Sequence, residues 1–110
     1  LGLAYAKMRN YGKAIHYTKK ALEMNPKSIM IQMQLSRFYL YNKQNDKARD
    51  ILFPVVEEHP KLAEAHFQLG IAALNENQYQ KALEFFEQTK EWLPDMPGLD
   101  ERIEEAKEAL

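Results

Sequence analysis

The chain has 110 residues, which is enough for one compact core, and we expect a single folding unit. Its 15 basic and 16 acidic residues give a net charge of −1, so composition predicts neither a nucleic-acid partner nor binding to an anionic membrane. No apolar run approaches the roughly 18 residues that span a bilayer, and we expect no membrane span. The absence of cysteine excludes disulfides and thiolate chemistry, and it fits a reducing compartment such as the cytoplasm.

The spacing of apolar residues predicts helices along the whole chain. Leu35, Phe38 and Tyr39 lie at i, i+3 and i+4, and residues 47–56 keep the same period. Polar turns such as NKQND and NENQ separate the helices, because asparagine ends helices and tolerates unusual backbone angles. In chain order, we expect helices at residues 1–8, 12–25, 29–42, 46–58, 62–75, 79–92 and 98–109.

These elements repeat along the chain at one constant interval. Pro26, Pro60 and Pro94 are evenly spaced, so each proline ends a helix pair instead of bending one long helix. Alanine and leucine keep the same register, at Ala14, Ala48 and Ala82 and at Leu1, Leu35 and Leu69. We expect one domain over 1–110, made of a truncated first repeat (1–28), a second (29–62), a third (63–96) and a capping helix (97–110).

In this register the units resemble the tetratricopeptide repeat, whose pattern is W-x₂-L-G-x₂-Y, then A-x₃-F, then P, in a unit of about 34 residues. The match is clearest in the third unit, which reads His66-x₂-Leu69-Gly70-x₂-Ala73, then Ala82-x₃-Phe86, then Pro94. The resemblance implies an all-α fold, a right-handed α-solenoid of antiparallel helix pairs with a C-terminal capping helix. It also implies a concave groove lined by the first helix of each unit.

The last helix has the pattern of a cap. Its apolar residues favour a one-sided contact, and its many carboxylates suit a polar outer face. The apolar residues are Leu99, Ile103, Ala106 and Leu110.

Pro54 falls inside the second helix of the middle unit, where it removes a backbone donor and frees the carbonyl of Asp50. One interpretation is a tolerated bend on the outer surface. The other is that the bend, with Phe53 beside it, aims the outer face at a partner.

Little in the sequence indicates catalysis. No phosphate-binding, dinucleotide-binding or nucleophile-elbow motif is present. His66 stands where the family has an aromatic residue, and we interpret it as a packed substitute, not a metal ligand. The acidic residues Glu101, Glu104, Glu105 and Glu108 follow helical spacing, which favours a solvated face over an ion site. We therefore predict no catalytic residue, no metal and no cofactor.

The resemblance places the binding surface on the groove-facing stripe of each first helix. In the first unit this stripe comprises Leu3, Ala6 and Lys7. In the other two units the residues are Met30, Met33, Arg37, Leu40, Tyr41, Glu64, Phe67, Ile71, Leu74 and Asn75. Many of these are apolar, and methionine adapts to differing shapes. The alternative is that part of the stripe simply packs between neighbouring helices.

The same resemblance argues against one known kind of ligand. Family members that hold the acidic C-terminal tails of heat-shock chaperones use lysines, asparagines and an arginine along the groove. Met33, Glu64 and Gln68 stand at corresponding positions here and do not form such a carboxylate clamp. Arg37 remains as an anchor for a ligand carboxylate or carbonyl.

The two ends of the chain carry opposite charge. Residues 1–27 hold six basic residues against Glu23, whereas residues 84–110 hold nine acidic residues against three basic ones. The chain opens on Leu1 already in helical pattern, which indicates a fragment without a front cap, so we expect the apolar side of Leu1 and Tyr5 to be exposed. Together these features predict head-to-tail self-association that weakens as salt rises.

The sequence thus favours a non-catalytic protein-interaction module that binds an apolar or amphipathic peptide segment in its groove. One alternative is a structural solenoid segment that packs on further repeats or on another copy. A second is a regulatory arm of an enzyme whose catalytic domain lies elsewhere.

Overall fold

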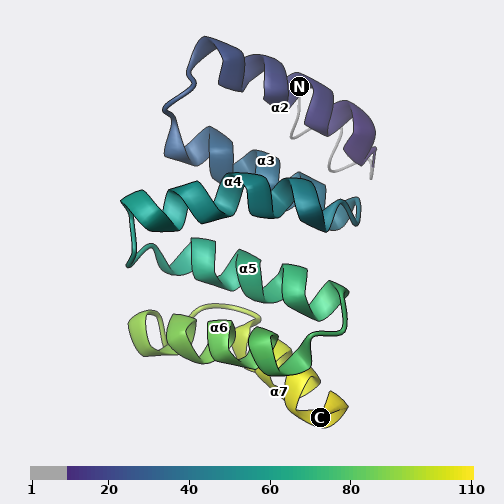
Figure 1. Cartoon of the computed structure of the whole chain (residues 1–110), viewed down its shortest axis with the longest axis vertical. Coiled ribbons are helices and arrows are strands. Elements are labelled where there is room, and N and C mark those ends of the chain that lie inside the picture. The colour runs from purple at the N-terminus through teal and green to yellow at the C-terminus, as the bar shows by residue number, and fades with distance from the viewer. Residues whose placement is uncertain (1–9) are drawn as a thin grey trace. The chain divides into compact units, whose positions relative to one another are not determined.

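The computed structural model describes residues 10–110, which form six α-helices and no strand within that range (Figure 1). They are α2 (Tyr11–Met24), α3 (Ile29–Tyr41), α4 (Asn45–Glu58), α5 (Ala63–Asn75), α6 (Tyr79–Trp92) and α7 (Leu99–Ala109). These bounds confirm the helices predicted from apolar spacing to within one residue. The helix predicted at 1–8, with Leu1, Leu3, Tyr5, Ala6 and Lys7, lies outside the described residues. None of the six helices is long and apolar enough to cross a bilayer.

Side chains that accept hydrogen bonds start α2 and α3. The Asn10 side-chain oxygen accepts from the backbone N–H of Lys13 at 3.2 Å, and Ser28 Oγ accepts from the N–H of Ile31 at 3.3 Å. These bonds occupy donors that the first turn of a helix leaves without intrahelical partners. The start of α2 and the start of α3 are therefore each stabilised by a capping side chain, Asn10 or Ser28.

The turns after α3 and α5 have the same left-handed geometry. Lys43 has φ 61° and Asn77 has φ 62°, and the two residues stand at the same position of consecutive repeats. In each turn, the next N–H donates to a carbonyl five residues earlier at 2.8 Å, from Gln44 to Tyr39 and from Gln78 to Ala73. This bond closes the helix end as a Schellman motif, in which glycine is the preferred left-handed residue and asparagine is tolerated.

Lys43→Gly should raise the free energy of unfolding, because the left-handed conformation costs a side-chain-bearing residue about 1–2 kcal/mol and glycine avoids that cost. After the extra backbone entropy of glycine in the unfolded chain, a gain of about 0.5–1 kcal/mol remains. Asn77→Gly should gain less, since asparagine already tolerates this region. Urea denaturation of the two variants measures both values, and a larger gain at Asn77 than at Lys43 would contradict this explanation.

The helices fall into two compact units, of which the first ends at Ile51 and the second comprises Leu52–Leu110. In the first unit α2 packs on α3, and in the second α5 packs on α6 and α6 on α7. The alanines that recur once in each repeat are fully buried, as expected for helices that approach closely at small residues. They are Ala14, Ala48 and Ala82, each 0% exposed.

In the second unit, Gly70 on α5 lies directly against the Phe86 ring of α6. A Cβ atom added to Gly70 would lie 2.7 Å from Phe86 Cδ1 and 3.0 Å from Cζ, which is too close for any side chain. The Phe86 side chain is itself completely buried. The glycine therefore makes room for the ring. At the same two repeat positions, the second repeat has Ser36 and Leu52, a larger residue and a smaller one, and both are buried.

Gly70→Ser should cost about 1–3 kcal/mol of unfolding free energy, because the new side chain overlaps the Phe86 ring. Phe86→Leu should cost about 1–2 kcal/mol through the space that it leaves. The double variant copies the combination of the second repeat, so its cost should be smaller than the sum of the two single costs. Chemical denaturation of all four proteins completes the cycle. Simple additivity would show that the two side chains do not compete for one volume.

The last helix, α7, packs one face on the core of the second unit. Leu99, Ile103 and Ala106 are buried in one cluster with residues of α5 and α6, as predicted for a cap. Leu110, which was predicted to share this contact, is exposed. Lys90 on α6 donates to Asp100 Oδ1 at 2.9 Å. This hydrogen bond and the charge of Asp100 raise the pKa of Lys90.

Helix α4 continues through Pro54 from Asn45 to Glu58. Pro54 and Phe53 are exposed, whereas Leu52 and Val55 are buried on the opposite side of the helix. An exposed proline costs less here because water can satisfy the carbonyl of Asp50 that its ring leaves without a donor.

Candidate functional site

Five of the predicted groove residues lie on α3, and the structure divides them between surface and core. Met30 is 78% exposed, Tyr41 is 53% exposed and Arg37 is also exposed. Met33 is only 4% exposed, and Leu40 is buried as well. Positions 30, 37 and 41 return to one side of an α-helix, whereas 33 and 40 are turned toward the core. The alternative that part of the stripe packs between helices therefore holds for Met33 and Leu40.

Gln34 completes the exposed side of α3, although the sequence reasoning did not select it. It lies four residues after Met30 and three before Arg37, and it is half-buried. The sequence spacing could have identified Gln34, since positions i, i+4, i+7 and i+11 lie on one face of a helix. We call Met30, Gln34, Arg37 and Tyr41 the α3 stripe.

A pair of tyrosines forms one end of the α3 stripe. The ring of Tyr41 lies 5.4 Å from that of Tyr11 on α2, with a tilt of 36° between the ring planes. Aromatic pairs at this separation are favourable, and they present a large, rigid apolar area. The stripe thus runs from a flexible methionine through an amide and a guanidinium to two aromatic rings.

The corresponding residues of α5, in the second unit, are less exposed. Leu74 is buried in the core, and Phe67 and Ile71 are half-buried against it, with the Phe67 ring 5.6 Å from that of Phe86. Glu64 and Asn75 are half-buried polar residues. Gln68 is buried, and its side chain donates to Glu64 Oε1 at 3.4 Å. The α5 surface is therefore mixed, with Phe67 and Ile71 as its accessible apolar part.

His66 has a packing role in the second unit. Its Nε2 lies 2.8 Å from the carbonyl oxygen of Pro60, and its ring meets Trp92 edge-on with the ring centroids 4.9 Å apart. Gln32 stands at the same repeat position, and its Nε2 donates to the carbonyl of Pro26 at 2.8 Å. Both side chains bind the carbonyl of the proline that ends the preceding repeat. The position therefore keeps a structural hydrogen bond with two different residue types.

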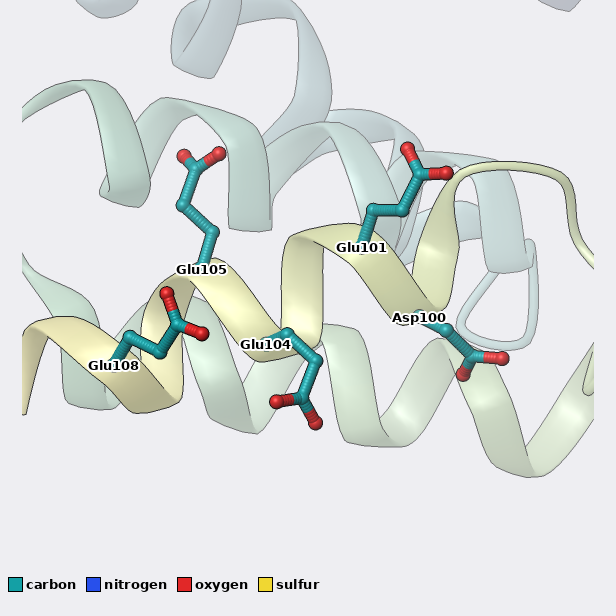
Figure 2. A pocket seen from close by; sticks show the side chains of 5 residues that line it. All are labelled: Asp100, Glu101, Glu104, Glu105 and Glu108. Atoms are coloured by element: carbon teal, nitrogen blue, oxygen red, sulfur yellow. The ribbon is translucent and has the colours of Figure 1, made fainter.

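Acidic side chains cover the exposed side of α7 (Figure 2). Glu101 and Glu105 extend to one side of the ribbon, while Asp100 and Glu104 extend to the other, so their carboxylates do not converge on a point. Within residues 10–110, no three histidine or acidic side chains are close enough together to hold a metal ion. Two of the carboxylates already have cationic neighbours, Asp100 with Lys90 at 2.9 Å and Glu105 with Arg102 at 3.6 Å.

The family model of the tetratricopeptide repeat matches this chain twice, at residues 1–28 and 63–95. The chain is also 31% identical over 91 residues to tetratricopeptide repeat protein 21B of Xenopus laevis, a match that covers 83% of the chain and 7% of that protein. The chain belongs to the tetratricopeptide repeat family. It spans between 7% and 29% of the length of the curated relatives that it matches.

Solved tetratricopeptide repeat domains have the same fold. The first such domain of human RPAP3 matches with a TM-score of 0.86 and 18% identity, over 98% of this chain and 85% of that one. The second domain of human RPAP3, solved in complex with the HSP70 peptide SGPTIEEVD, matches with a TM-score of 0.80 and 15% identity, over 96% of this chain and 88% of that one. Family and fold are those of protein-interaction modules, which are typically non-catalytic.

The division of α3 between surface and core predicts opposite effects for its two methionines. Met33→Glu should destabilise the chain by about 3–5 kcal/mol, because it places a carboxylate in the core without a partner. Met30→Glu should change stability by less than about 0.5 kcal/mol, since its side chain is exposed and lies in the first turn of α3, where negative charge is favoured. Urea denaturation of both variants measures the difference. Equal effects would contradict the burial of Met33.

Proposed function

We propose that this chain is a non-catalytic module that binds an apolar or amphipathic peptide segment of a protein partner through the α3 stripe. The observation that carries this proposal is the exposure of Met30 and Tyr41 beside Arg37 on one side of a short helix. Large apolar side chains that gather on an exposed face favour contact with another molecule. From the family resemblance, we propose that this side of α3 faces the inner groove.

Each part of the α3 stripe suits a different feature of a peptide. The flexible thioether of Met30 can adapt to apolar side chains of different shape. The guanidinium of Arg37 offers five N–H donors to a carboxylate or to backbone carbonyls. Tyr41, held by its contact with Tyr11, supplies rigid aromatic area, and such residues often dominate binding energy. The peptide that fits best has apolar side chains near both ends and one acidic or carbonyl acceptor between them.

On α5, Phe67 and Ile71 form a second, smaller apolar surface that we also assign to peptide contact. Their partial exposure leaves edges available while their inner sides pack on the core. Leu74 is not one of the proposed contact residues because it is buried. Met33 and Leu40 on α3 are left out for the same reason.

The RPAP3 complex supports peptide binding in general, since a domain of this fold was solved with a bound peptide. The residues here favour a different peptide. An acidic tail would need lysines and asparagines at these positions. Glu64 has a negative charge instead, and Gln68 and Met33 are buried. Arg37 alone is a weak basis for binding several carboxylates. We therefore infer that apolar content, not a run of acidic residues, selects the ligand.

A peptide-selection experiment tests this proposal. Random twelve-residue peptides displayed on phage are selected on the chain, and the Kd of an enriched peptide is measured by fluorescence anisotropy. Met30→Asp and Tyr41→Ser should each weaken that peptide by about tenfold or more, the loss of roughly 1.4 kcal/mol expected for one good apolar contact. The thermal melting temperature of Met30→Asp should stay close to that of the parent, because the side chain is exposed. Tyr41→Ser should lower it by no more than a few degrees, through loss of the contact with Tyr11.

Met24→Asp is the control, since Met24 is exposed at 81% like Met30 but ends α2 and is not one of the proposed contact residues. It should leave the Kd unchanged. The peptide SGPTIEEVD should bind more weakly than the selected peptide. An enriched peptide that loses as much affinity with Met24→Asp as with Met30→Asp, or a preference for the acidic peptide, would overturn the assignment.

A further inference from the structure

Helix α2 carries a second stripe that the proposed peptide contact does not use. Its residues are spaced by four, three and four positions, so they share one side of the helix. They are Lys13, Tyr17, Lys20 and Met24. The two lysines and Met24 are exposed, and Tyr17 is half-buried. Lys20 Nζ lies 5.8 Å from the Tyr17 ring centroid, and the His16 ring meets Tyr17 edge-on at 5.2 Å. We call these four residues the α2 stripe.

Helix α4 carries a stripe with the same spacing and the opposite charge. Asp46, Asp50, Phe53 and Glu57 follow one another at four, three and four residues along a single continuous helix. All four are exposed, and Phe53, at 47%, places an apolar ring among the carboxylates. The buried residues Ala48, Leu52 and Val55 lie on the other side. Asp46 also pairs with Arg49, one turn along the helix.

The two stripes match when the helices run antiparallel. Because both have the spacing four, three, four, reversing one of them brings Lys13 opposite Glu57, Tyr17 opposite Phe53 and Lys20 opposite Asp50. Two pairs of opposite charge then flank one aromatic pair. In the parallel alignment Tyr17 faces Asp50 and Lys20 faces Phe53, and only the first position keeps opposite charges. Helices that pack side by side also make contact through residues spaced alternately by four and three.

We propose that the chain self-associates through this pair of stripes, with the α2 stripe of one copy packed antiparallel on the α4 stripe of a second copy. The occupant is a second copy because the complementary charges and the matching spacing are both present in this one sequence. The contact covers the exposed Phe53 ring and the accessible part of the Tyr17 ring, and it places Met24 opposite Asp46 at its end. It gives a role to Phe53 beside Pro54, and it is independent of the peptide contact on α3.

The other acidic helices match the α2 stripe less well. The exposed side of α6 carries Glu84, Glu87 and Glu91, and that of α7 carries five carboxylates, but neither side has a large apolar residue among its acidic ones. They would attract the lysines but place no aromatic ring opposite Tyr17. The head-to-tail arrangement predicted from the charged ends would use these helices, so the two arrangements predict different sensitive residues.

The contact is small and partly ionic, so we expect weak association that depends on salt. One helix on another buries less area than a stable interface requires, which places the Kd at about 0.1 mM. Raising salt from about 0.05 M to 0.5 M shortens the range over which the charges act and should weaken association several-fold. Sedimentation velocity from about 10 µM to 1 mM measures both effects.

Reversal of single charges tests the register. Lys20→Glu and Asp50→Lys should each weaken self-association by about tenfold or more at low salt, because each places like charges opposite one another. When the two variants are mixed, the introduced glutamate faces the introduced lysine in one contact, and the native Lys20 and Asp50 face each other in the reciprocal one. The mixture should therefore associate like the parent. Phe53→Ser should weaken association at low and high salt alike, since its contribution is apolar.

Lys19→Glu is the matched control, because Lys19 is exposed next to Lys20 but points away from the stripe. It should weaken association far less than Lys20→Glu does. Circular dichroism and thermal melting confirm that every variant is folded. A strict monomer at about 1 mM and low salt would overturn the proposal, as would equal effects at Lys19 and Lys20 or failure of the mixture to associate. Greater sensitivity to Glu104→Lys and Glu108→Lys would establish the head-to-tail arrangement instead.

Discussion

The close approach of paired helices at small residues is the constraint on which the structure depends. Gly70 lets the Phe86 ring fill the space between α5 and α6, and the alanine that recurs in each repeat is completely buried. A single helix pair has too little apolar area to be stable alone, so it must place its large side chains between neighbours. Every exposed residue is therefore one that this packing does not require. The surfaces available for function follow from what the core has already used.

On α3, the division between buried and exposed residues determines which side chains can contact a partner. Helical geometry turns Met33 and Leu40 toward the core, and the same geometry leaves Met30, Arg37 and Tyr41 outside. The exposed residues thus combine three kinds of contact on a rigid element whose inner side is fixed by packing. A helix held in this way loses little entropy when it binds, because its backbone is already ordered. The corresponding surface of α5 has less to offer, since Phe67 and Ile71 are partly engaged by the core of their own unit.

The sequence predicts the fold well because its signals agree. The prolines, the buried alanines and the apolar period each mark the same repeat register, and the helix bounds follow to within one residue. Burial within the groove stripe was harder to predict. Met30 and Met33 are the same residue type three positions apart, and only the direction of the neighbouring helices separates core from surface.

At some repeat positions the contact is kept although the residue type changes. A consensus sequence pattern does not identify such positions. Gln32 and His66 both replace the family's aromatic residue, and both bind the carbonyl of the preceding proline at 2.8 Å. At this position the two repeats share a hydrogen bond and not a side chain. The outward positions of α2 and α4 are less constrained, because most of their side chains are exposed. Charge and exposed aromatic residues at these positions can differ between repeats at little cost to folding, and so they are where one repeat can acquire a partner that another does not have.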